Sequence, residues 1–482
     1  MMSILFPLVL VGVAPTNAPV LTEYPASERS WVIGEGRGAC DSVPEGHPFE
    51  GLETRSRPWP GRQSAEERSA VQATVDALVS AMNTGDSSAI LAHRTRLEFA
   101  LGRYVGEPED RPFYGQPVDV STPDLHLIKN LWSDQHLRSN GLYPWDIAAL
   151  TTPSRGAPDR LRVATRIARA HLHVYESNEL EHDDYLHEAV AAAEYLLTVQ
   201  AANGVFGYPY DANATIGLRG VAARFVHEAR QRGFEVTEGN WIIDDLQSGD
   251  LNFDNAQAGL FLLHAYVQTG DARYLESARR AGEWAMRRPL VANYNYNGFN
   301  GQLLSRLYRV TGEEHYLDRA RLVFEHGVLS GQLQNGRWFD QHNAKIQYHS
   351  ILMSQLVEFY LALQLAQDPF STTVESAIVR GLDNLATEIT TYGSSNTQEM
   401  LAVDALVFGS RALGQRELWT RAINVDVNFL VDRFRPRISA LGQRLPDPLG
   451  TYILFASEAS SAPTGIDSVV GPIMLATPRQ GN

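Results

Sequence analysis

Two stretches of this 482-residue chain share one pattern: TGDARYLESARRAGEWA at residues 269–285 and TGEEHYLDRARLVFEHG at residues 311–327. Each begins with Thr-Gly, continues through acidic residues to a Tyr-Leu pair, and ends in an amphipathic helical pattern. Thr311 follows Thr269 by 42 residues. Weaker copies surround Tyr185 and Leu418, which lie about two periods away on either side. The pattern therefore predicts a repeat of helical hairpins.

The spacing and the loops of this repeat favour a closed ring. Repeats of tetratricopeptide type are about 34 residues long and have short turns. Here the additional residues lie in long loops, rich in Asn and aromatic residues, that precede the more apolar helices. Stacked hairpins form either an open solenoid or a ring. We predict an all-α fold, an (α/α)n toroid built as an incomplete or closed barrel of helical hairpins, with the apolar helices inside and their loops meeting at one end.

The predicted toroid covers residues 66–433, between an irregular N-terminal segment (19–65) and an irregular C-terminal tail (434–482). Residues 1–18 contain an apolar stretch followed by small residues, which is typical of a secretory signal peptide. No Lys or Arg precedes the apolar stretch, so a buried N-terminal segment is the alternative. The expected location is the periplasm or outside the cell.

Composition excludes several classes of protein. The net charge of −15 argues against a nucleic-acid partner, because such proteins need a basic surface to displace counterions. The single cysteine, Cys40, permits neither an internal disulfide nor a Cys-based zinc site. No later stretch is long and apolar enough to predict a membrane span. No phosphate loop or dinucleotide motif is present, so neither a metal nor another cofactor is expected.

Asparagines recur where two consecutive inner helices are predicted to begin. Asn255 lies 14 residues before Thr269, and Asn297 lies 14 residues before Thr311. Either residue alone fits a helix cap, since Asn is a favoured N-cap residue. The same two regions also contain Asn252, Asn293, Asn295 and Asn300. This number exceeds what two caps require and suggests a binding role.

The third predicted inner helix follows the stretch NGRWFDQHNAKIQYHSILMSQL at residues 335–356. Tyr348 and His349 stand at its entrance, and His342 lies on the incoming loop. Such residues serve as acid, base or hydrogen-bond donor groups beside amides. The alternative is that Tyr348 and His349 pack and form hydrogen bonds inside the ring.

The stretch GRWFDQHNAKIQYHSILMSQLVEFYLAL at residues 336–363 resembles alginate lyases of the α/α-toroid type, which have a Tyr-His pair at the start of an apolar helix. The resemblance implies that Tyr348 is the catalytic base and acid. The stretch NYNYNGFNGQLL at residues 293–304 resembles the Asn-Asn-His motif of that family. Asn295 agrees with that motif, Tyr296 replaces an Asn, and Asn297 replaces the histidine. The family's arginine is missing where Gln341 and His342 stand. A more general likeness extends to glucuronan and chondroitin lyases.

We therefore predict a polysaccharide lyase that cleaves an anionic, uronic-acid-containing polysaccharide, alginate-like or glucuronan-like, by β-elimination. Donors must neutralise the uronate carboxylate and hold the developing enolate, while a base removes the C5 proton and an acid protonates O4. The predicted catalytic residues are Tyr348, His342, His349 and Asn297. The predicted substrate-binding residues are Asn255, Asn295, Trp338, Arg337, Gln341, Tyr296 and Trp241, with Trp338 offering a face on which a sugar stacks.

Two other classes of function remain open at this point. A glycoside hydrolase on the same toroid, such as an unsaturated glucuronyl hydrolase, needs two carboxylates across the scissile bond. Its candidates are Asp244, Asp245, Asp254 and Asp340, although Asp244 and Asp245 also fit a turn or a cap. A non-catalytic carbohydrate-binding protein or helical scaffold is the third class. The concentration of Tyr, His and Asn on one set of loops argues against that third class.

Overall fold

The computed structural model describes residues 65–101, 118–121, 161, 165, 168–169, 172, 175, 184–215, 217–291, 293–338, 343, 346–393 and 401–440. The predicted signal peptide and nearly all of both predicted extensions lie outside the described residues. Three residues of the predicted site lie outside them too, namely Asp340, Gln341 and His342.

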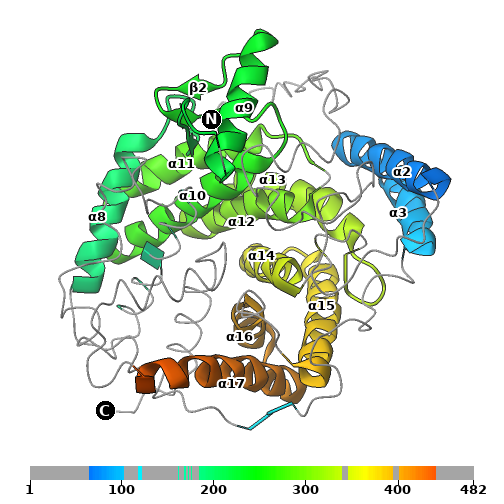
Figure 1. Ribbon diagram of the computed structural model, residues 1–482. Coiled ribbons are helices and arrows are strands. Elements are labelled where there is room, and N and C mark those ends of the chain that lie inside the picture. The colour runs from blue at the N-terminus through cyan, green and yellow to red at the C-terminus, as the bar shows by residue number, and fades with distance from the viewer. Residues whose placement is uncertain are drawn as a thin grey trace, which may run out of the picture.

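The described residues form an all-α fold of helical hairpins (Figure 1), which confirms the predicted α/α-toroid class. The last described helix ends at Ala440, beyond the predicted limit of 433. The helices are α2 (Ala65–Thr84), α3 (Ser87–Leu101), α8 (Asp184–Val199), α9 (Gly217–Gln231), α10 (Asp250–Thr269), α11 (Ala272–Met286), α12 (Tyr294–Thr311), α13 (Glu314–Gly327), the 3-10 helix η2 (Leu329–Gly331), α14 (Ile346–Ala366), α15 (Ser371–Tyr392), α16 (Leu401–Leu413) and α17 (Glu417–Ala440).

The helices form two layers. The helices α10, α12, α14 and α16 pack side by side in the inner layer, and each also packs against the helix that follows it, α11, α13, α15 or α17. Figure 1 shows α14 between α12 and α16, with α15 and α17 outside them. The inner helices α10 and α14 are buried along nearly their whole length, whereas α11, α13 and α15 are buried on one face only. This difference is why the inner helices are the more apolar ones in the sequence.

The repeated Thr-Gly pairs end α10 and α12 in the same way. Gly270 and Gly312 both have φ 73°, a left-handed conformation that glycine adopts without steric cost. Their N–H groups donate to Tyr266 O and Tyr308 O, each at 2.7 Å. Each repeat therefore makes the same sharp turn from an inner helix to an outer one.

The repeated tyrosines connect neighbouring outer helices. Tyr274 of α11 donates its hydroxyl to Glu194 of α8 at 2.7 Å, and Tyr316 of α13 donates to Glu283 of α11 at 3.3 Å. Both tyrosines are buried. The weaker repeat copy around Tyr185 corresponds to α8, an outer helix that packs against α10 and α11. The Tyr-Leu motif thus belongs to the packing of the ring.

A small antiparallel sheet is the one sheet among the described residues. Its strands are β1 (Tyr208–Pro209), β2 (Thr237–Glu238) and β3 (Trp241–Ile242), in the order β1-β3-β2. Tyr208 pairs with Ile242, and Thr237 pairs with Ile242 on the other side. The sheet and α9 lie just before α10 in the chain and next to it in Figure 1.

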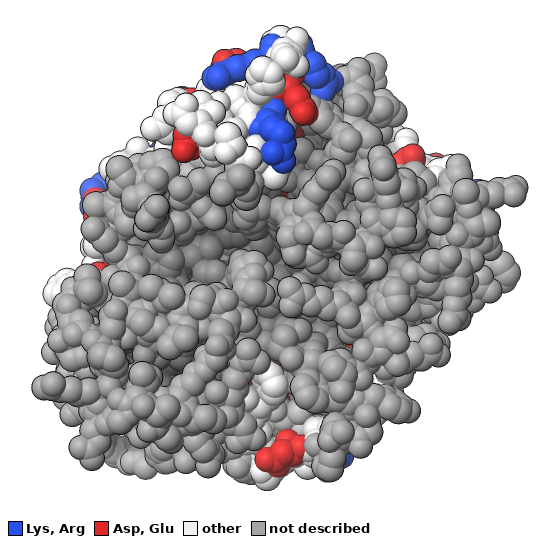
Figure 2. Space-filling model, in the orientation of Figure 1, with Lys and Arg blue, Asp and Glu red and all other residues white. Residues whose placement is uncertain are grey.

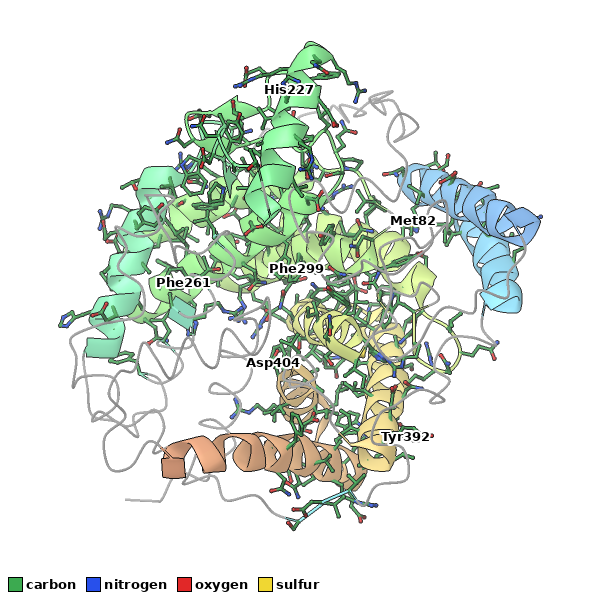
Figure 3. The ribbon with its side chains drawn as sticks, viewed as in Figure 1. Met82, His227, Phe261, Phe299, Tyr392 and Asp404 are labelled. Carbon is green, nitrogen blue, oxygen red and sulfur yellow. The ribbon has the colours of Figure 1, made fainter. Side chains whose placement is uncertain are left out.

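Aromatic stacking fills the contacts between helices. Phe253 of α10 stacks on Phe299 of α12 with ring centroids 3.9 Å apart, and Phe324 of α13 stacks on Phe359 of α14 at 4.4 Å. Figure 3 shows Phe299 in the middle of the helical array. No helix in the described part of the chain is long and apolar enough to cross a membrane.

Candidate active site

The first turns of three inner helices lie together at one end of the ring. Asn252 of α10 donates to the Tyr296 carbonyl of α12 at 3.4 Å, and the Tyr296 hydroxyl donates to Asp250 Oδ1 at 3.3 Å. Asn295 of α12 donates to Asn343, which lies just before α14, at 2.7 Å. The loops that lead into the inner helices therefore converge, and the positive ends of the three helix dipoles share one edge of the molecule.

The two asparagines in equivalent repeat positions hold backbone segments. Asn297 accepts from Val291 N at 2.9 Å, and its amide group donates to Val291 O and Gly327 O, both at 2.8 Å. Asn255 accepts from Phe206 N at 3.1 Å and donates to Ala281 O at 3.0 Å. Both residues lie within their helices rather than before the first turn, and both side chains are buried. Both amide hydrogens of Asn297 are therefore already used inside the fold, which leaves no donor for its predicted catalytic role. Neither residue is a helix cap.

Four amide side chains form a connected cluster between the start of α12 and the first half of α14, and we call Asn293, Asn295, Asn343 and Gln355 the amide cluster. Asn343 Oδ1 accepts from Asn295 Nδ2 and from the Asn295 backbone N at 3.3 Å. Gln355 Nε2 donates to Asn295 O at 3.2 Å, and Asn343 Nδ2 donates to Asn293 Oδ1 at 3.3 Å. Sequence reasoning missed Asn343 and Gln355, because their partners lie on another helix.

The backbone contacts determine how each amide is oriented. A backbone N–H can only donate and a backbone carbonyl can only accept, so Asn343 must present oxygen to Asn295, and Gln355 must present nitrogen. This orientation leaves Asn295 Oδ1, Gln355 Oε1 and Asn293 Nδ2 buried without a hydrogen-bond partner. Buried polar atoms without a partner are uncommon in proteins and mark places where water or a ligand supplies the partner.

Tyr348 lies in the first turn of α14, with 8% of its surface exposed. Gln355 follows it by seven residues, about two helical turns, so both side chains project from the same side of α14. Gln355 contacts Asn295, and it lies so close to Gly298 that a Cβ there would clash with its Oε1. Tyr348 therefore stands on the side of α14 that faces α12, at the end where the amide cluster lies.

His349 points away from this side. Its ring lies edge-on to Trp338, with centroids 5.6 Å apart, and its Nε2 lies beside Gly381 of α15. Burial, and secondly the Arg337 charge, hold the pKa of His349 well below its usual value. Neither ring nitrogen has a hydrogen-bond partner. The Gly381 backbone beside the ring raises the pKa, but by less than burial and Arg337 lower it. The neutral imidazole is thus part of the packing between α14 and α15 and supplies no positive charge to Tyr348.

The buried state of His349 gives the protein a pH-dependent stability. Between the lowered folded pKa and the unfolded value of about 6.5, the unfolded chain binds a proton that the folded chain does not. The free energy of unfolding therefore falls as pH drops below about 6.5, by up to about 1.4 kcal/mol per pH unit. Urea unfolding at about pH 7.5 and about pH 5.5 should show a larger loss for the native sequence than for His349→Gln. Equal losses would contradict the assignment.

Trp338 and Arg337 are buried rather than presented to a substrate. Trp338 has no exposed surface and donates its Nε1 to Val328 O at 2.9 Å. Arg337 forms an ion pair with Glu388 and donates its Nε to Asn384, both on α15. The predicted stacking face of Trp338 and the predicted binding role of Arg337 are corrected accordingly, because packing against the outer layer uses both side chains.

The remaining predicted binding residues divide in the same way. Tyr296 is fully buried and its hydroxyl is used by Asp250. Trp241 is partly exposed and lies on β3, where it pairs with Pro209 and Glu238. Asn295 alone, among the predicted binding residues of α10, α12 and β3, belongs to the amide cluster and keeps an unused polar atom.

The candidate carboxylates of a hydrolase differ in their surroundings. Asp245 is buried, forms an ion pair with Arg288, and accepts from the backbone N–H groups of Gly249 at 3.1 Å and Leu251 at 3.0 Å. It therefore holds the start of α10, as the turn and capping interpretation predicted. Asp254 is buried early in α10. The described residues contain no group of three or more His, Cys, Asp or Glu side chains that would hold a metal ion.

Charged side chains of both signs are mixed on the part of the surface described near α9. Figure 2 shows blue and red atoms together at the top. Arg230, in the last turn of α9, pairs with Glu235 at 3.1 Å. This region therefore forms no basic patch of a single sign that would attract a polyanion.

No protein-family model matches the chain, and no curated protein matches it. Several solved structures are similar in outline. One is a glycosyl hydrolase family 88 protein from Bacteroides vulgatus, with 10% identity over 72% of this chain and 97% of that chain and a TM-score of 0.43. A polysaccharide lyase has 10% identity, coverage of 72% and 96%, and a TM-score of 0.41. An unsaturated glucuronyl hydrolase variant from Streptococcus agalactiae has 12% identity, coverage of 75% and 98%, and a TM-score of 0.41. These values are too low to transfer an activity or a residue role.

Proposed function

We propose that this protein is a polysaccharide lyase that cleaves a uronic-acid-containing polysaccharide by β-elimination. The observation that supports the proposal best is the position of Tyr348 on the α12 side of α14, at the same end as the amide cluster. A phenolic hydroxyl, an unused amide donor on Asn293 and an unused amide oxygen on Asn295 lie near the starts of α12 and α14, and Gln355 adds a second unused oxygen further along α14.

Each step of an elimination has a candidate group at this end. Tyr348 removes the C5 proton and returns a proton to O4 as the bond to the leaving sugar breaks. Asn293 Nδ2 is the cluster's unused donor, and it takes the role of neutralising the uronate carboxylate that the sequence had suggested for Asn297. The positive ends of the α10, α12 and α14 dipoles favour the same negative charge. Asn295 Oδ1 and Gln355 Oε1 are the cluster's unused acceptors.

A substrate screen tests the proposed reaction. The protein is incubated with alginate, glucuronan, hyaluronan, chondroitin and ulvan, and both ultraviolet absorbance and reducing ends are followed. Elimination produces a C4–C5 double bond conjugated to the carboxylate, so absorbance and reducing ends should increase together on one of these polymers. Reducing ends that form without the absorbance would replace the lyase with a hydrolase.

A further inference from the structure

A charged cluster lies far from Tyr348, on the same two inner helices. Glu358 of α14 is 1% exposed and lies between two arginines of α12. It accepts from Arg306 Nε at 2.8 Å and from Arg306 Nη2 at 2.7 Å, and it forms a second ion pair with Arg309 Nη1. Glu358 follows Tyr348 by ten residues, which places it about 15 Å further along α14.

Glu358 is the shared acceptor of the two arginines. Burial alone would raise the pKa of Glu358, but the charges of Arg306 and Arg309 outweigh burial and lower it. Glu358 is therefore ionised. The side chain of Arg309 is 29% exposed, so solvent and small solutes reach its guanidinium group.

The two arginines use different edges of the guanidinium group. Arg306 holds Glu358 with the fork formed by Nε and Nη2, whereas Arg309 uses only Nη1. No described residue accepts a hydrogen bond from Nε or Nη2 of Arg309. These two groups form the planar fork that binds carboxylate and phosphate oxygens in pairs.

We infer that Arg309, supported by the Arg306–Glu358 pair, is a binding site for a small oxyanion, a carboxylate or a phosphate group. Its fork binds two oxygens of the anion, and the positive charge of the Arg309 guanidinium group supplies the electrostatic attraction. Helix geometry places Arg309 about 21 Å from Asn295 along α12, so this site is separate from the proposed active site. The inference does not depend on the lyase activity.

Calorimetric titration of the full chain tests this site without an activity assay. Sodium phosphate and sodium glucuronate are titrated separately, with chloride holding the ionic strength constant. We expect saturable binding of at least one anion and a loss of about tenfold to 100-fold in affinity in Arg309→Gln, because charge-assisted hydrogen bonds are lost. The anion that binds distinguishes a phosphate source from a uronate source.

The matched control is Arg279→Gln. Arg279 also pairs with a glutamate, Glu313, and its side chain is 38% exposed, but it lies on the outer helix α11. This control should bind like the native protein. Arg309→Lys keeps the charge without the fork and should also bind more weakly, which provides the test if Arg309→Gln fails to fold by circular dichroism. Absence of saturable binding by the native protein, or equal affinity in all variants, would overturn the inference.

Discussion

Replacing Tyr348 with Phe is expected to reduce the rate of elimination by about 10²–10⁴-fold while the protein stays folded. Loss of a proton-transfer group typically has an effect of about this size, and the substitution removes one hydroxyl and keeps the ring. The initial rate of ultraviolet absorbance increase on the best polymer measures the effect. Circular dichroism and urea unfolding establish that the fold is retained.

Tyr360→Phe is the matched control for this experiment. Tyr360 lies on the same helix and is equally buried, at 8% exposed, but it stands twelve residues further along α14. Burial, followed by the charge of Glu375, raises the pKa of Tyr360, so its hydroxyl stays protonated. We expect this variant to keep its activity. Full activity of Tyr348→Phe would refute the mechanism, and loss of turnover in a folded Asp254→Asn variant would favour a hydrolase.

Replacing Asp245 with Ala is expected to lower the free energy of unfolding by about 3–5 kcal/mol, the usual cost of breaking a buried ion pair. The substitution leaves Arg288 buried without its carboxylate. It also removes the acceptor for the N–H groups of Gln247, Gly249 and Leu251 at the start of α10. Urea unfolding followed by circular dichroism measures the loss.

The adjacent Asp244 provides the control. Its side chain is exposed and accepts one hydrogen bond, from Leu246 N at 2.8 Å. Asp244→Ala should therefore cost less than about 1 kcal/mol, as is usual for surface positions. Similar losses in the two variants would contradict the structural role assigned to Asp245. A stable Asp245→Ala variant without activity would return this residue to the list of catalytic carboxylates.

The repeating helices could be predicted from the sequence because their causes are local. The Thr-Gly pairs at 269–270 and 311–312 act through the conformation of one glycine and the carbonyls of the preceding turn. The apolar character of α14 and the one-sided pattern of α11 follow from burial on all sides or on one side. Interactions within one helical turn leave a periodic pattern that can be read without the rest of the chain.

The assignment of the polar residues could not be read in this way. Asn297 and Asn295 are two residues apart and of the same type. Yet Asn297 donates a hydrogen bond to the carbonyl of Gly327, while Asn295 belongs to the amide cluster. An asparagine side chain can cap a helix, hold a backbone segment or bind a ligand, and its own sequence context is compatible with all three. The residue that decides among these three roles is the hydrogen-bond partner, which lies on another helix or in another loop.

The sequence by itself determined a ring of helical hairpins whose polar loops precede the inner helices. Only the tertiary structure decided which residue of the Tyr348–His349 pair faces the amide cluster. Successive residues of a helix point about 100° apart, so one of them faces α12 and the other packs between Trp338 and α15. The position of the neighbouring helices, rather than the identity of the two residues, makes Tyr348 the candidate base and leaves His349 a neutral core side chain.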